Sequence, residues 1–185
     1  MVESPYKIKV SGNSDLQELS KNTWIVILHA SRIPPHVGIL IDGSYNSLTI
    51  KGHELNISLP VLLKTSQQKK IETLFIQLKK HPVFSSDFQL EICQHYIKQY
   101  PKVNQEATCL SPVKYFLQEF YVIPLINKEL LYELMERLKQ NDYIQKVIGL
   151  NVDFKLKNNE FQLPIYTNDE LNKLIEIERK TIDEK

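Results

Sequence analysis

Apolar and polar positions divide the chain into short strands in its first half and amphipathic helices further along. The unbroken apolar run from Trp24 to Leu28 is typical of a strand covered on both faces, so we expect it at the centre of a sheet. A second apolar run, His36 to Ile41, ends at Asp42-Gly43, a dipeptide that favours a two-residue hairpin turn. The return strand should then run from Tyr45 to Lys51.

A further strand is predicted at Ile71 to Leu78, followed by three amphipathic helices. Ser86 and Gln89 form a capping box for the first helix, and Pro101 ends it. The second helix follows the Thr108-Cys109 segment, and the third is expected from Asn127 to about Gln140. The apolar stripe of the third helix favours a core position, with a homodimer surface as the alternative if the domain closes without it.

The pattern changes after residue 150. Val152 to Leu156 and Phe161 to Ile165 predict a hairpin, and the capping box Thr167/Glu170 predicts a final helix. Because roughly 35 residues cannot bury a core of their own, residues 151–185 should pack on a single domain formed by residues 1–150. The predicted fold class is α+β, with a curved antiparallel sheet and helices packed on it.

Composition narrows the classes of function. The chain has 185 residues, of which 42% are hydrophobic and 24% charged, and its formal net charge is +1. A near-neutral chain has no overall positive potential that would attract nucleic acid. Its apolar runs are shorter than the ~20 residues that a membrane span needs. The segment Met1 to Lys7 lacks the features of a secretory signal, so we expect a cytoplasmic protein without nucleic-acid or membrane partners.

The register of the hairpin determines which of its side chains share a face. With a two-residue turn, Ile41 lies opposite Ser44 and His36 lies opposite Thr49. One face is apolar apart from Asn46 and should be core: Val37, Ile39, Ile41, Leu48 and Ile50. The other face carries a polar strip: His36, Gly38, Ser47, Thr49 and Lys51. Gly38 should leave room for a close approach to His36, although a histidine after two prolines can equally cap a strand edge.

The two cysteines differ in their surroundings. Cys109 directly precedes a helix, where backbone N–H groups and the helix dipole favour a thiolate. A neighbouring imidazole such as that of His36 would complete a nucleophile that needs no metal or cofactor. Cys93 lies in the middle of a helix and is interpreted as a small core residue.

These residues resemble a known family. A His-Val-Gly-Ile strand, a tight hairpin and a later Cys at a helix start, over about Thr23 to Tyr121, resemble the circularly permuted papain-like proteins. That group includes the YiiX-type and NlpC-related hydrolases and the lecithin:retinol acyltransferase group. The resemblance implies that Cys109 is the nucleophile, that His36 is the base, and that a third polar residue on the adjoining strand orients the imidazole.

This sequence differs from that family at the third, orienting residue. The family usually places a His or Glu there, on the return strand of the hairpin. Here the register places Thr49 opposite His36, so Thr49 ranks first, followed by Glu54 and His53 if these residues fold back. Gly52 makes His53 and Glu54 look like loop residues.

Two functions from different classes follow. The first is a cysteine-dependent hydrolase or acyl-transfer enzyme that acts on an amide, peptide or thioester bond of a small-molecule or peptide substrate. The second is a non-catalytic interaction domain on the same scaffold. The five histidines form no helical i,i+4 pair and no CxxC motif is present, so no metal or cofactor is expected.

Overall fold

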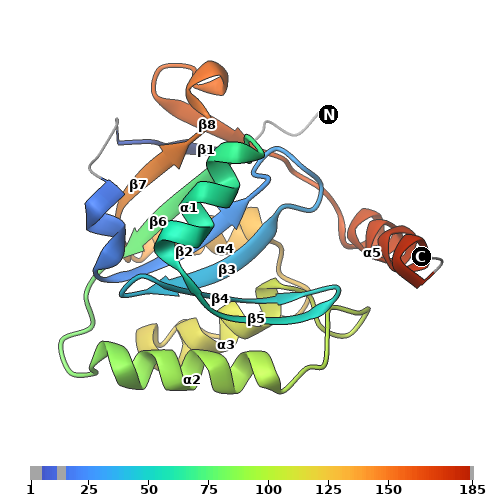
Figure 1. Cartoon of the computed structure of the whole chain (residues 1–185), viewed down its shortest axis with the longest axis horizontal. Coiled ribbons are helices and arrows are strands. Elements are labelled where there is room, and N and C mark those ends of the chain that lie inside the picture. Colours follow the sequence, from blue (N-terminus) through green and yellow to red (C-terminus); the bar gives the residue numbers. More distant parts are fainter. Residues whose placement is uncertain (1–5, 12–15, 184–185) are drawn as a thin grey trace.

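The computed structural model describes residues 6–11 and 16–183, and within them the fold is α+β, as predicted (Figure 1). The main sheet is antiparallel throughout and has the strand order β5-β4-β3-β2-β6-β7. Its strands are β2 (Thr23–Leu28), β3 (His36–Ile41), β4 (Ser44–Thr49), β5 (Gly52–Ser58), β6 (Thr73–Leu78) and β7 (Ile144–Leu150). A small second sheet pairs β1 (Tyr6–Lys9) with β8 (Glu160–Leu163).

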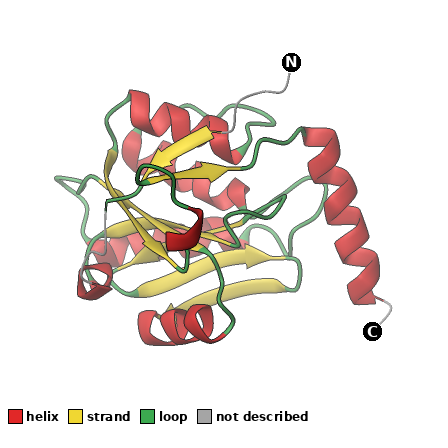
Figure 2. Ribbon diagram, turned by 90° about the horizontal axis from the view of Figure 1, so that it is seen from above, coloured by secondary structure: helices red, strands yellow, loops and turns green. Residues whose placement is uncertain are grey.

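Helices cover both faces of the main sheet. They are α1 (Leu59–Gln68), α2 (Ser86–Lys98), α3 (Leu110–Tyr121), α4 (Leu131–Gln140) and α5 (Asn168–Asp183), with short 3-10 helices at Leu16–Ser20 and Asp153–Lys155. In Figure 1, α1 lies in front of the sheet and α4 behind it, and the apolar residues form one cluster on each side. Figure 2 shows that α5 stands at the side of the body. None of the helices in the described ranges is long and apolar enough to cross a membrane.

Strand β2 is central, as its apolar run predicts. It pairs with β3 on one side and with β6 on the other. Ile25 and Ile27 face the large core cluster with α3 and α4, whereas Trp24 and Val26 face the cluster with α1. Both faces of the strand are therefore removed from water, which explains why no polar alternation is visible in its sequence.

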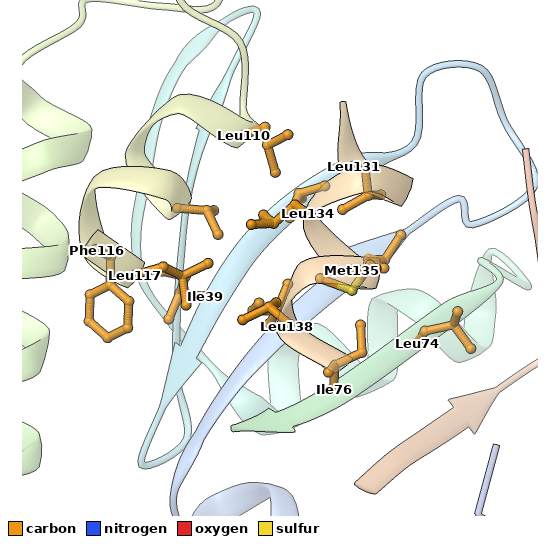
Figure 3. Packing of buried hydrophobic residues seen from close by; sticks show 14 of the residues in the cluster. Ile39, Leu74, Ile76, Leu110, Phe116, Leu117, Leu131, Leu134, Met135 and Leu138 are labelled. Atoms are coloured by element: carbon orange, nitrogen blue, oxygen red, sulfur yellow. The ribbon is translucent and has the colours of Figure 1, made fainter. Parts of the chain in front are cut away.

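The apolar stripe of α4 belongs to the core, so the core interpretation of this helix is confirmed. Leu134, Met135 and Leu138 pack against the sheet near Leu74 and Ile76 (Figure 3). The predicted start at Asn127 is wrong, because the helix begins at Leu131. The Glu133 carboxylate, rather than an Asn127 cap, accepts the Leu130 N–H at 2.7 Å.

The predicted hairpin is confirmed. Ile41 lies opposite Ser44, so the turn contains two residues, Asp42 and Gly43. Both have positive φ angles, +43° and +79°, which is the requirement of a type I′ turn.

Other expectations for local structure fail. Residues 52–58 form a strand rather than a loop, and β7 was not predicted. The C-terminal segment does not form its own hairpin, because β8 pairs with β1 from the start of the chain. Phe161 and Leu163 of β8 enter the large core cluster, so the tail packs into the same core as the main sheet.

Candidate functional site

The candidate site lies where β3 and β4 part. Their pairing runs from Ile41–Ser44 to Ile39–Asn46 and does not continue to His36. The buried Asn46 side chain is held at this point, where its carbonyl oxygen accepts the Asn56 N–H at 2.9 Å. The open end of this strand pair gives space for other elements to enter.

The start of α3 approaches this space. The Thr108 N–H donates to Ser111 Oγ at 3.0 Å, and the Ser111 N–H donates to the Thr108 carbonyl at 3.1 Å, so Thr108 is fastened to the first turn of the helix. Cys109 is the N-cap residue, and its Sγ lies 4.0 Å from the Pro35 carbonyl oxygen. The Val37 N–H also interacts with this sulfur. The Cys109 thiol therefore contacts the backbone on both sides of His36.

The His36 ring belongs to a chain of three polar side chains. Its Nε2 lies 3.1 Å from Ser47 Oγ, and Ser47 Oγ donates to Glu54 Oε2 at 3.1 Å. An ionised carboxylate can only accept, so the single hydroxyl proton of Ser47 is directed to Glu54. His36 must then donate from Nε2–H, and this leaves Nδ1 as the unprotonated nitrogen of the neutral ring.

A bulge in β5 makes this chain possible. Tyr45 pairs with Ile57, but Ser47 pairs with Glu54, so β5 has one residue more than β4 between these pairs. Asn56 in the bulge has a φ of +56°. Without the extra residue Ser47 would face Leu55, and the carboxylate would lie on the other face of the strand.

Burial keeps both candidate catalytic groups neutral. The pKa of His36 is lowered to about 4, first by burial and then by the nearby His29 and Arg32. Burial raises the pKa of Cys109 to about 11, against the effect of the N–H groups of Val37, Cys109 and Leu110, and the negative charge of Glu178 raises it further. At neutral pH Cys109 is therefore a thiol and His36 a neutral imidazole.

The structure separates the three candidates for the third role. The predicted contact of Thr49 with His36 is wrong, because the Thr49 hydroxyl donates to the Gly52 carbonyl at 3.0 Å in the tight turn before β5. His53 is exposed, and its Nε2 lies 2.5 Å from the Tyr100 carbonyl oxygen. Only Glu54 is joined to His36, and the link passes through Ser47. The predicted polar strip includes both His36 and Ser47, but Ser47 is not among the predicted site residues.

The expected open space at Gly38 is filled by the protein itself. A Cβ atom at residue 38 would lie only 2.5 Å from the Tyr45 ring. Gly38 therefore serves the packing of Tyr45 and not the approach of a ligand.

A cavity of about 1020 Å³ connects these groups, and its lining includes both His36 and Cys109. One wall carries a buried ion cluster in which Arg137 Nε and Nη2 donate to the two Glu129 oxygens at 2.6 and 2.9 Å. The Lys114 ammonium lies 3.8 Å from the same carboxylate. Leu171 and Ile175 of α5 form another part of the lining, so the C-terminal helix is a wall of the cavity.

Searches of protein-family models, of curated proteins and of solved structures find no match to this chain. Across residues 6–11 and 16–183, no group of three or more His, Cys, Asp or Glu side chains could hold a metal ion. The chemistry of the cavity must therefore be derived from its own residues.

Proposed function

We propose that this protein is a cysteine-dependent acyl-transfer enzyme or hydrolase that acts on an amide, peptide or thioester bond. Cys109 is the nucleophile and His36 is the general base. The supporting observation is the direction of the hydrogen bonds from His36 through Ser47 to Glu54. Because Nε2 carries the proton, Nδ1 has the lone pair that can accept the Cys109 proton. This assignment agrees with the roles implied by the resemblance to permuted papain-like proteins.

In the first step Nδ1 takes the S–H proton while the sulfur attacks the substrate carbonyl carbon, so that a C–S bond forms and the carbonyl electron pair moves to oxygen. N–H groups at the start of α3 and that of Val37 already interact with the sulfur, and they are suited to hold the resulting oxyanion nearby. Collapse of this intermediate expels the amine or thiol, which takes the proton from the imidazolium. Water or an acceptor nucleophile then cleaves the acyl-cysteine thioester.

The cavity supports a small-molecule or peptide substrate. Its volume of about 1020 Å³ is near the upper end of the range for sites of small ligands. Ile57, Val61 and Leu62 provide apolar lining on the side of α1 and β5. The proposal places the protein in the cytoplasm, where a reducing compartment keeps thiols free, and both cysteines are free here.

The second candidate function is a non-catalytic binding domain. Two observations favour it. The pKa of Cys109 is raised to about 11 by burial, and the thiol donates to the Pro35 carbonyl rather than to the imidazole. A protein with this thiol could use the same cavity only to hold a ligand.

The deciding experiment is acylation by p-nitrophenyl acetate, followed by nitrophenolate release and by mass spectrometry of the intact protein. We expect one acetyl group, located on Cys109, with a rate that saturates with ester concentration. Cys109→Ala should abolish the acetylation, and His36→Ala should slow it by about 100-fold or more, the usual contribution of a general base.

Cys93→Ala is the matched control, because Cys93 is buried and its pKa is raised to about 12 by burial. This variant should acetylate as the wild type does. If His36→Ala reacts at the wild-type rate, general-base catalysis is absent and the binding-domain function is the better one.

A further inference from the structure

The Tyr45 hydroxyl is a buried polar group without a partner. The side chain is 1% exposed, and no residue in the described ranges forms a hydrogen bond with its Oη. An unpaired buried hydroxyl lowers stability, so native structures contain few of them. Tyr121 shows the usual arrangement, since its Oη donates to the Lys79 carbonyl at 2.9 Å.

The position of this hydroxyl is close to the chain of polar side chains on His36. Tyr45 and Ser47 are two residues apart on β4 and so project from the same face. The Tyr45 ring crosses to β3, where its Oη lies 2.7 Å from the place of a Cβ on Gly38. Gly38 is two residues from His36 on the same strand. The absence of a side chain at residue 38 thus lets the phenol lie on the face of β3 that also carries His36.

Ser47 and Glu54 both act on this phenol. Burial raises the pKa of Tyr45, the Ser47 hydroxyl lowers it, and the negative charges of Glu54 and Cys109 raise it. A neutral phenol offers one O–H donor, and the carboxylate of Glu54 has a second oxygen, Oε1, beyond the one that Ser47 uses. The phenol therefore lies next to the Ser47–Glu54 pair without a well-formed hydrogen bond to either residue.

We propose that Tyr45 is a positioning residue for His36, because its hydroxyl donates to the Ser47–Glu54 pair when His36 takes up the Cys109 proton. This inference rests on the proposed function. The positive imidazolium strengthens the bonds from His36 to Ser47 and from Ser47 to Glu54. The added hydrogen bond from Tyr45 holds Ser47 and Glu54 in line with the His36 ring. Tyr45 also lines the cavity, but in this role it acts through His36 and not on the reacting sulfur.

The test compares Tyr45→Phe with Tyr121→Phe in a Cys93→Ala background. Alkylation of Cys109 by iodoacetamide is measured from pH 5 to 10, together with the thermal unfolding midpoint. Tyr45→Phe removes an unpaired hydroxyl, so its unfolding midpoint should equal or exceed that of the parent. Its alkylation rate at neutral pH should fall about tenfold, and the pH profile should shift to higher pH. Tyr121→Phe should lower the midpoint and leave the alkylation profile unchanged.

The outcomes separate the inference from the proposed function. If His36→Ala leaves alkylation unchanged, His36 does not activate Cys109 and the proposed function fails. If His36→Ala slows alkylation but Tyr45→Phe does not, the proposed function stands and the role of Tyr45 is overturned. Should Tyr45→Phe not fold, 3,5-difluorotyrosine at residue 45 supplies a stronger donor of nearly the same shape. We then expect faster alkylation than in the parent, and an unchanged rate overturns the inference.

Discussion

His36 and Ser47 are hydrogen-bonded at 3.1 Å across two strands that no longer pair at this point. The bond replaces the missing backbone contacts, since it joins β3 and β4 beyond Ile39 and Asn46. It also selects the protonated nitrogen of the imidazole, because Ser47 is already the donor to Glu54. One side-chain bond therefore has a structural and a chemical consequence, and the two can be separated by mutation.

Ser47→Ala should reduce both stability and thiol reactivity. The variant leaves the His36 Nε2–H without its acceptor in a partly buried site, which costs up to about 1–3 kcal/mol of unfolding free energy. Alkylation of Cys109 should slow because the imidazole loses its orientation. Denaturant unfolding and iodoacetamide kinetics measure the two effects. Ser44→Ala is the control, since the Ser44 hydroxyl donates to Asn56 of β5 and not to His36, and its alkylation rate should stay at the parent value.

Stability should fall in acid because His36 titrates differently in the two states. Its pKa is about 4 in the folded protein and near 6.5 when unfolded, so the unfolded state binds the proton first. The contribution of His36 is fully present above pH 6.5 and is lost as the pH falls to about 4. The limiting loss is up to about 3 kcal/mol.

The pKa of the partly buried His29 is also lowered, so His29 adds a loss of stability in acid of the same sign. Comparison of the wild type with His36→Gln isolates the contribution of His36. Unfolding free energies of both proteins should be measured by urea titration at intervals from pH 4 to 7. The difference between wild type and variant should shrink steadily below pH 6.5. A difference that stays constant over this range would show that His36 does not titrate as the structure requires.

Glu178→Gln should make Cys109 more acidic. The negative charge of Glu178 raises the pKa of Cys109, so its removal shifts the pH profile of alkylation toward lower pH. The shift should be small and should diminish at high salt, since Glu178 is exposed and pairs with Arg32 at 3.4 Å. Glu176→Gln is the matched control on α5, where Glu176 pairs with Lys180 at 3.3 Å. Equal shifts in the two variants would mean that the effect is not specific to residue 178.

Gly38→Ala should destabilise the protein through Tyr45. The added Cβ would lie 2.5 Å from a buried aromatic ring, and overpacking of this kind costs about 1–3 kcal/mol. In a Tyr45→Leu background the same substitution should cost less, because the ring is absent. A double-mutant cycle from denaturant unfolding gives the coupling. Additive costs would show that Gly38 is required for a reason other than the Tyr45 ring.

Local sequence signals predicted the centre of this fold. The β-branched run at Trp24 identified the central strand, and Asp42-Gly43 identified the hairpin with its correct register. β5 was missed because it is an exposed edge strand with polar residues and a glycine at its start. The β1–β8 pair was missed because it joins segments about 150 residues apart, and a single sequence carries no signal for such pairing.

The candidate site was predicted in part. Cys109 and His36 both line the cavity, but the register argument selected Thr49 for the third role. A regular ladder would place Thr49 opposite His36, whereas the β3–β4 pairing ends early and β5 contains the Asn56 bulge. A bulge depends on tertiary contacts such as the Asn46 amide bonds, so its position could not be seen in the strand pattern.

The burial of the Cys109 thiol has a consequence for the lifetime of the protein in the cell. Peroxide and electrophiles react with the thiolate, and a cysteine whose pKa is about 11 exposes almost none of it at neutral pH. Cys109 is therefore protected from oxidation while the cavity is in its resting state. Sensitivity to hydrogen peroxide should appear only when a ligand or a variant brings the sulfur to its ionised form.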